Sequence, residues 1–379
     1  MRIGIDIRAL GSASAGRGVG TYIRGLLGGL AGEIEEAGAQ RSQDVVLFAH
    51  QRDGVLSSAG RFESVALSRP RRGITLWDQI AWPLLLSRRR IAVFHSPFYA
   101  VPRLRPSGCR VVQTIHDLTP LKRPGSVPPR AARIFRANFQ LARTADRIIA
   151  PSEATRADVI QMLGIDAGRV QVVPEACDIT DAEIAAADEA LPRTLARLGL
   201  RRPYLIHSGG HDMIKNLSGV VAAFSMLAAS RRELMLVIAG AHGPGSAALI
   251  ARSARLGVLD RVRMPGYIPR ADLIVLYRGA SALVYPSWME GFGLPLLEAM
   301  TCGLPVVASR AAALQEVGGD ACLYADAVDP ASIAAACARI LDEPDLAADL
   351  ARRGRARAAG YSWRHAARRT LEIYEEAAA

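Results

Sequence analysis

The chain has 379 residues, half of them hydrophobic, and a formal net charge of +11. This length exceeds what one hydrophobic core usually serves, so we expect two domains. No apolar run approaches the roughly 18 residues of a membrane-spanning helix, and the five scattered cysteines match neither a disulfide framework nor a zinc site. The chain opens on a strand-like run without a signal peptide, which favours a cytoplasmic protein.

Short β-rich runs alternate with helix-like stretches along the chain. They are residues 2–7, 44–50, 91–96, 110–117, 146–152, 202–210, 234–240, 262–267, 282–287 and 304–309. Such alternation is typical of parallel sheets with helices on both faces. We therefore predict an α/β fold of two doubly wound, Rossmann-like domains that face a cleft. The predicted domains are residues 1–175, joined by a C-terminal helix at about 361–379, and residues 176–360.

A glycine-rich turn follows the first strand. Gly16, Gly18 and Gly20 lie between this strand and a helix that begins "TYIRGLLGGL". A dinucleotide site requires G-x-G-x-x-G and an acidic residue after the next strand. Here the third glycine comes one position early and the next strand ends in histidine. The pattern argues against NAD, and we expect no cofactor.

Residues 286–309, "PSWMEGFGLPLLEAMTCGLPVVAS", join a strand to a helix and to the next strand. Pro295 suits the first turn of the helix, and Gly303 suits its end. Gly291 and Gly293 therefore form a loop at the carboxyl edge of a parallel sheet. Backbone amides and a helix N-terminus at such an edge can hold a phosphate.

Two carboxylates flank this predicted phosphate position. Glu290 precedes it and Glu298 lies in the first turns of the helix. They would repel a phosphate unless each accepts hydrogen bonds from hydroxyl groups, and a nucleotide sugar supplies a ribose diol and sugar hydroxyls. The plainer alternative for Glu298 is a carboxylate that interacts with the helix dipole.

The same stretch resembles the E-x7-E signature of retaining GT-B glycosyltransferases of family four, which includes sucrose synthases and bacterial mannosyltransferases. The likeness extends to "GRGVGTY", "GGHDMIKN", "GYIPRADLIVLYRGASALVYPS", "EVGGDACLYAD" and "YSWRHAARRTLEIY", and so covers nearly the whole chain. It implies an N-terminal acceptor-side domain and a C-terminal donor domain. It also implies a front-side displacement in which a donor phosphate oxygen takes the acceptor's proton.

The resemblance implies roles for individual residues. Glu298 corresponds to the glutamate that binds the nucleotide's ribose, and Glu290 to the one that contacts the donor sugar. Lys215 corresponds to a lysine on the donor diphosphate. His116 follows a strand and resembles a histidine near the anomeric carbon, although a lone histidine is more often structural. The implied catalytic set is His116, Lys215 and Glu290.

The implied donor-binding set is larger. It comprises Gly18, Val19, Lys215, Glu290, Gly291, Phe292, Gly293, Leu294 and Glu298. We expect Phe292 to shape the loop by packing. The family often has arginine just before the lysine, where this chain has Ile214, and His211 is a weak candidate to replace that cation. No two aspartates lie two positions apart, so the D-x-D metal signature is missing and no metal is expected.

Basic charge is concentrated between Arg69 and Arg147. This region contains sixteen Arg or Lys and only three Asp, and the remainder of the chain has a net charge of about −2. Residues 74–90, "ITLWDQIAWPLLLSRRR", have the mixture of an interfacial membrane helix, although Pro83 argues for a break. We expect an anionic membrane surface as partner, and no nucleic acid. The alternative is a packed segment whose arginines lie in water.

Together these features predict a retaining, metal-independent transferase. It would move a hexose of mannose or glucose type from a GDP- or UDP-linked donor to a glycan or lipid-linked acceptor in surface polysaccharide assembly, at the inner face of the cell membrane. Two alternatives stay open: a non-catalytic polyanion- or membrane-binding protein, and a sugar-nucleotide epimerase or phosphorylase on the same fold.

Overall fold

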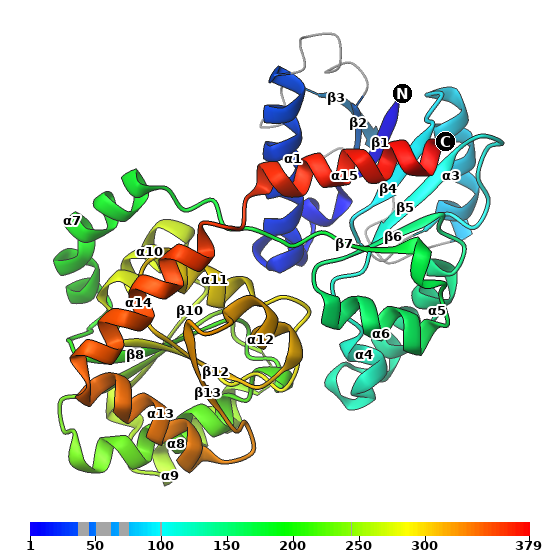
Figure 1. Ribbon diagram of the computed structural model, residues 1–379. Helices are drawn as coiled ribbons and strands as arrows, with labels where there is room; N and C mark the ends of the chain where they lie inside the picture. The colour runs from blue at the N-terminus through cyan, green and yellow to red at the C-terminus, as the bar shows by residue number, and fades with distance from the viewer. Residues whose placement is uncertain (37–44, 51–61, 68–75, 99–100, 244) are drawn as a thin grey trace. The chain divides into compact units, whose positions relative to one another are not determined.

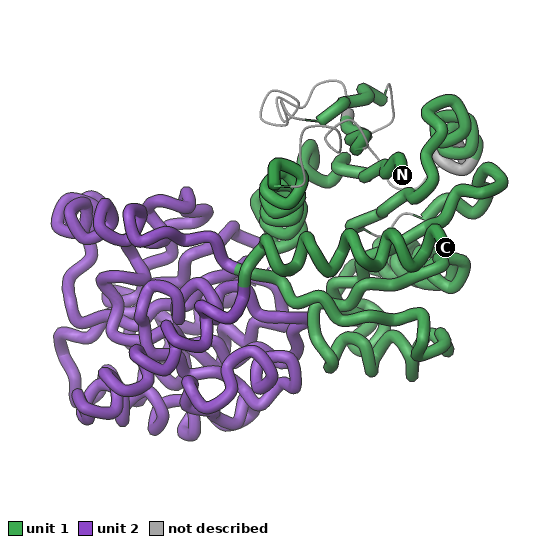
Figure 2. The backbone as a smooth tube through the Cα atoms, turned by 45° about the horizontal axis from the view of Figure 1, so that its top comes forward, with its two compact units in different colours: residues 1–176, 362–379 green, residues 177–361 purple. Residues whose placement is uncertain are grey.

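The computed structural model contains two parallel sheets, each with helices packed on it (Figure 1). The chain divides into two compact units, shown in green and purple in Figure 2. The first unit comprises residues 1–176 and 362–379, and the second comprises residues 177–361, bounds that differ by one residue from those expected. The structure describes residues 1–36, 45–50, 62–67, 76–98, 101–243 and 245–379.

The first unit is built on a seven-stranded sheet in the order β3-β2-β1-β4-β5-β6-β7. Its strands are β1 (Ile3–Asp6), β2 (Val45–His50), β3 (Glu63–Leu67), β4 (Val93–Ser96), β5 (Arg110–Thr114), β6 (Arg147–Ala150) and β7 (Val170–Val172). Its α-helices are α1 (Gly18–Glu36), α3 (Leu76–Arg88), α4 (Thr119–Lys122), α5 (Pro129–Ala142), α6 (Glu153–Leu163) and α15 (Trp363–Ala378). The strand order reverses between β1 and β4, the kind of position where doubly wound sheets bind ligands.

The second unit has a six-stranded sheet in the order β10-β9-β8-β11-β12-β13. Its strands are β8 (Tyr204–Ser208), β9 (Met235–Ala239), β10 (Val262–Gly266), β11 (Ala282–Tyr285), β12 (Val306–Ser309) and β13 (Cys322–Ala325). Its helices are α7 (Asp181–Arg197), α8 (Leu217–Ser230), α9 (Ser246–Arg255), α10 (Arg270–Gly279), α11 (Leu294–Thr301), α12 (Ala312–Gly318), α13 (Pro330–Asp342) and α14 (Pro344–Ala358). The order reverses between β8 and β11, so the loops after these two strands meet at the switch point.

Alternate side chains of the second sheet enter different cores. Ile206 and Val237 belong to the apolar cluster that includes α10 and α11, whereas Leu205 and Leu236 belong to the cluster that includes α8 and α13. Successive strand residues point to opposite faces, so a strand covered on both faces is apolar at every position. This is why these strands appear in the sequence as continuous apolar runs.

The C-terminal helix packs in the first unit through the glycine face of α1. A Cβ atom at Gly25 would lie 2.0 Å from the Trp363 ring, and one at Gly29 would lie 2.2 Å from the Trp363 carbonyl oxygen. Only a residue without a side chain allows this approach between α1 and α15.

A buried chain of hydrogen bonds also ties α15 to the sheet. Tyr374 Oη lies 2.6 Å from His95 Nδ1, His95 Nε2 lies 2.8 Å from Thr114 Oγ1, and Thr114 Oγ1 lies 3.0 Å from Tyr22 Oη. Burial lowers the pKa of His95 to about 3, so the ring is neutral. A neutral ring has one donor and one acceptor nitrogen, so His95 donates one of these two hydrogen bonds and accepts the other.

The glycine turn differs from the prediction. Residues 18–20 form the first turn of α1 instead of the loop before it, and that loop consists of two 3-10 turns, Arg8–Gly11 and Ala13–Gly16. Glycine is required at position 20 because a Cβ atom there would lie 2.2 Å from the carbonyl oxygen of Ala15.

Pro83 does not break its helix. It lies inside α3, and the expectation of a break there is wrong. The neighbouring Trp82 and Leu86 are buried against Phe94 and Phe48, and this burial offsets the hydrogen bond that proline cannot make.

One described segment, Met213–Ser230, is apolar and long enough to cross a membrane by length and composition. Its share buried inside the protein is 56%, and α8, which makes up most of it, contributes to the core of the second unit. It fits a core helix of a folded unit.

Candidate active site

Lys215 and Glu290 form a close ion pair at the switch point of the second unit. Lys215 follows β8 in a short 3-10 turn, and Glu290 follows β11. Lys215 Nζ donates to Glu290 Oε1 at 2.7 Å and to Tyr285 Oη at 2.8 Å. The two charged side chains are only 14% and 11% exposed. The two loops are also joined by a hydrogen bond of 2.8 Å from the Trp288 amide to the carbonyl of Ile214.

The surroundings of this pair keep Lys215 protonated. Burial alone would lower the pKa of Lys215, but the neighbouring Glu290 and Tyr285 raise it above its ordinary value. Burial in turn raises the pKa of the Tyr285 hydroxyl. Lys215 is therefore a cation at any physiological pH, with a carboxylate in direct contact.

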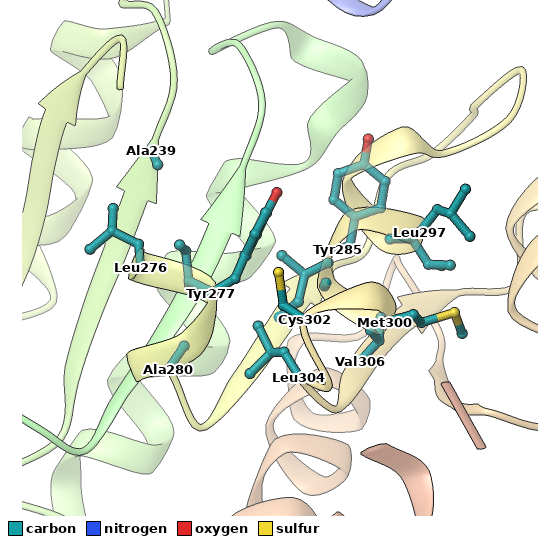
Figure 3. Close-up of a cluster of buried hydrophobic side chains, with 14 of the residues drawn as sticks. Ala239, Leu276, Tyr277, Ala280, Tyr285, Leu297, Met300, Cys302, Leu304 and Val306 are labelled. Atoms are coloured by element: carbon teal, nitrogen blue, oxygen red, sulfur yellow. The ribbon is translucent and has the colours of Figure 1, made fainter. Parts of the chain in front are cut away.

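Glu298 lies on α11 and meets a tyrosine from α10. Tyr277 Oη donates to Glu298 Oε2 at 3.0 Å. Figure 3 shows that the hydroxyl groups of Tyr277 and Tyr285 both point out of the apolar cluster, away from Leu304. Burial raises the pKa of Glu298 from 4.5 to about 7, although the hydrogen bond from Tyr277 acts in the opposite direction.

The loop between these glutamates is shaped by close packing. Gly293 is the N-cap of α11 with φ 110°, and a Cβ atom there would lie 2.6 Å from Leu314. Leu294 begins the helix. Phe292 is buried and packs edge-on against Tyr361 with ring centroids 5.7 Å apart, so its expected packing role is confirmed. Gly291 completes this turn before α11.

His211 lies in the same loop as Lys215 and has one unused nitrogen. The Gly243 amide donates to Ser246 Oγ at 2.9 Å, and Ser246 Oγ lies 2.7 Å from His211 Nδ1. His211 Nε2 is buried, and it has no partner among the residues that the structure describes. Burial lowers the pKa of His211. Nδ1 is therefore occupied by Ser246, and Nε2 is left without a protein partner among the described residues.

His116 lies in the first unit, after the carboxyl end of β5. Its Nδ1 is 2.9 Å from Glu175 Oε1 and its Nε2 is 3.0 Å from the carbonyl oxygen of Pro97. Burial acts to lower the pKa of His116, but Glu175 and the carbonyl raise it overall. Both nitrogens therefore donate, and the ring has no free site to accept a proton.

The predicted residues fall into two groups. Lys215, Glu290, the loop residues 291–294 and Glu298 belong to the second unit. Residues 18 and 19 and His116 belong to the first unit, where Tyr22 of α1 packs edge-on against His116 with centroids 4.7 Å apart.

Three side chains that hold these residues were missed from the sequence: Tyr277, Tyr285 and Glu175. Tyr285 carried a usable signal, since it is the last residue of the strand directly before the Glu290 loop. Within the described part of the chain, no group of three or more His, Cys, Asp or Glu side chains is placed to hold a metal ion.

Two doubly wound units, with a lysine–glutamate pair and a glycine-capped helix at one switch point, define a GT-B glycosyltransferase fold. The profile of the family described as glycosyl transferases group 1 matches residues 197–357, and that of glycosyltransferase family 4 matches residues 17–181. The chain belongs to the group 1, family 4 glycosyltransferases.

Individual proteins agree with this assignment. The O-antigen chain mannosyltransferase B of Escherichia coli is 31% identical, with 94% of this chain and 96% of the relative covered. The sucrose-phosphate synthase of Thermosynechococcus elongatus has a TM-score of 0.76 at 21% identity, covering 99% and 98% of the two chains. The Anabaena protein HepE, solved with UDP and glucose, has a TM-score of 0.75 at 17% identity, covering 99% and 100%. These two structures share the fold.

Proposed function

We propose that this glycosyltransferase transfers a hexose, with retention of configuration, from a nucleotide diphosphate sugar to a glycan or lipid-linked acceptor in surface polysaccharide assembly. The contact between Lys215 and Glu290 at the switch point carries the proposal. The E. coli relative, an O-antigen mannosyltransferase, supports the mannose type and the pathway. The complex of HepE with UDP and glucose supports a nucleotide-sugar donor.

In this proposal the donor diphosphate binds beside Lys215 and the N-terminus of α11. Negative charge grows on the leaving phosphate, and a fixed cation stabilises it. The Nε2–H of His211 supplies a second donor, which takes the place of the arginine that the family often has where this chain has Ile214. Glu298 accepts hydrogen bonds from the ribose, and Glu290 from the sugar. No metal ion is required.

His116 then acts as a positioned cation. Because Glu175 and the Pro97 carbonyl occupy both ring nitrogens, we assign it no role as a general base. This agrees with a front-side displacement in which a donor phosphate oxygen receives the acceptor's proton.

Nucleotide binding tests the site directly. At pH 8, above the Glu298 pKa of about 7, Glu298→Ala should weaken binding of UDP or GDP by roughly 1–3 kcal/mol, the cost of a lost hydrogen bond to a charged group. Glu233→Ala, which removes an exposed carboxylate of the same unit, serves as the control. Unchanged affinity in Glu298→Ala, measured by calorimetry, would remove Glu298 from the site.

The reaction is tested with a panel of nucleotide sugars and product analysis. Transfer with retention that survives EDTA supports the proposal, whereas loss on chelation that Mg²⁺ or Mn²⁺ restores contradicts metal independence. Turnover of the donor alone, or with phosphate alone, would identify an epimerase or a phosphorylase. Stabilisation by heparin and by no nucleotide would identify a polyanion-binding protein.

We also propose that the protein works in the cytoplasm on the anionic inner face of the cell membrane, through α3. Ile80 is 65% exposed and Leu84 is 51% exposed. With the exposed Arg88 they follow a four-residue spacing, which places them on one face of the helix. Arg69, Arg71 and Arg72, which belong to the same basic region, lie outside the described residues.

A further inference from the structure

The amino edge of the first sheet carries a cavity lined by arginines. Its volume is about 530 Å³, within the range of ligand pockets. Its lining residues include Arg110 and Arg147, which begin β5 and β6, and Arg169, which directly precedes β7. His116 follows the carboxyl end of β5, so this cavity lies at the other edge of the sheet and is distinct from the site described above.

The two acidic side chains that line the cavity already have cationic partners. Asp146 pairs with Arg105 and, at 3.3 Å, with Arg110, and it also accepts from the Val111 amide at 2.7 Å. Glu376 accepts from Gln171 at 2.5 Å and from Arg369 at 3.0 Å. These bonds, with the charges of Arg369 and Arg147, lower the pKa of Glu376. Neither carboxylate forms an ion pair with the remaining arginines of the cavity.

Three guanidinium groups are left without a carboxylate partner among the described residues: Arg143, Arg147 and Arg169. Arg169 donates to the carbonyls of Arg143 and Ala145, at the end of α5. Arg147 donates to the carbonyls of Asp146 at 3.1 Å and of Glu376 at 3.5 Å.

Two of these arginines have polar atoms without a partner among the described residues. Arg147 Nε is buried and has no partner in the described structure. Arg143 is exposed, and no hydrogen bond or ion pair holds its guanidinium within the described part of the chain. Three guanidinium groups therefore share one cavity and none of them forms an ion pair with a described carboxylate, although the charge of Glu376 acts on Arg147.

We propose that this cavity binds a phosphate or diphosphate group. Guanidinium groups match phosphate oxygens in charge and in fork-shaped geometry. The lining contains no aromatic side chain, so a nucleobase would have no ring to stack on. The ligand is therefore a phosphorylated molecule without a base, either free in solution or as the headgroup of a lipid.

The test compares two double variants with equal loss of charge. Arg143→Gln with Arg147→Gln changes the cavity. Arg133→Gln with Arg136→Gln changes two exposed arginines of α5 that do not line it. Each variant is titrated with inorganic pyrophosphate by calorimetry. Binding in the second unit is common to both and cancels in the comparison.

We expect pyrophosphate to bind roughly tenfold more weakly to the cavity variant than to the control, because hydrogen bonds to charged groups are lost. Sedimentation with phosphatidate vesicles and with neutral vesicles distinguishes a lipid headgroup from a phosphorylated molecule free in solution. Weaker binding of phosphatidate vesicles identifies a lipid headgroup, and a loss confined to pyrophosphate identifies a soluble ligand. Equal behaviour of both variants in both assays would overturn the proposal. Should the double variant melt earlier than the parent, the exposed Arg143→Gln alone replaces it.

Discussion

At the scale of single residues, Glu298 combines a buried position with a raised pKa. Below its ordinary pKa of 4.5 the carboxyl is protonated in both folded and unfolded chains, and the folded state keeps the proton up to about pH 7. The stability that this proton contributes is fully present below pH 4.5 and is lost as the pH rises through about 7.

Glu298→Gln should remove this pH dependence. Between pH 5 and pH 8 the variant's unfolding free energy should gain on the parent's by roughly 1–3 kcal/mol, as a shift of this size implies. Urea denaturation at the two pH values measures the gain. A difference between variant and parent that stays constant with pH would show that Glu298 titrates normally.

The effects of substitutions at Lys215 and Glu290 on the free energy of unfolding should be strongly coupled. Lys215→Met leaves a poorly exposed carboxylate without its cation, and the loss of one partner of a buried pair costs about 3 kcal/mol or more. The double variant with Glu290→Gln should lose less than the sum of the single changes, by roughly 1–3 kcal/mol. Chemical denaturation of the four proteins measures this coupling.

The exposed pair Arg339–Glu343, at 3.0 Å on α13 and its cap, is the control for this cycle. Solvent screens such a pair, so its coupling should be much smaller. Equal coupling for the two pairs would mean that the Lys215–Glu290 contact has no special environment.

At the scale of elements, the packing of α1 on α15 makes opposite predictions for two glycines of one helix. Gly25→Ala should destabilise the first unit by about 1–3 kcal/mol through overpacking against Trp363. Gly28→Ala should stabilise it by up to about 1 kcal/mol, because alanine favours helix and no atom lies within 4 Å of the new methyl group. The melting temperatures of the two variants, each compared with that of the parent, test these predictions. A shift in the same direction for both would contradict this packing.

The strands show which part of the fold the sequence reveals. All ten predicted runs contain a strand of one of the two sheets. The strands that were missed, β3, β7 and β13, all lie at sheet edges. Each contains partly exposed positions, since an edge strand is not covered like a central one. Its sequence therefore lacks the continuous apolar run by which the central strands were found, and of the four described edge strands only β10 was predicted.

In the candidate site, too, the sequence indicates some side chains and not the partners that they contact. From the sequence, Glu290 and Glu298 could be placed on either side of one glycine loop by the local pattern, and Lys215 could be placed by the family resemblance. Their partners could not, because Tyr285 and Tyr277 lie 70 and 21 positions away from the residues that they contact. A contact between distant positions depends on sheet order, which no local pattern contains.

At the scale of the whole molecule, charge and exposed apolar area on α3 predict membrane association. Arg88→Ser with Arg90→Ser should weaken binding to anionic vesicles at low salt by roughly 2 kcal/mol, about 1 kcal/mol for each cation near the surface. Arg89 is left unchanged because it already pairs with Glu63 at 2.5 Å. Vesicle sedimentation at low and high salt measures the effect.

The control for this experiment is Arg232→Ser with Arg255→Ser, two exposed arginines of the second unit. It should bind vesicles as the parent does. If the parent binds neutral and anionic vesicles equally, or binds neither, Arg88 and Arg90, at and just after the end of α3, are ordinary solvated surface.

The path of the chain through its two units has a consequence for biosynthesis. The second unit is one continuous segment, whereas the first needs residues from both ends of the chain. A ribosome releases the N-terminal end first. The second unit can therefore close while residues 362–379 are still unmade, and until then the glycine face of α1 and the His95 hydrogen bond to Tyr374 lack their partners. The half of the protein that is synthesised first is the half that finishes folding last.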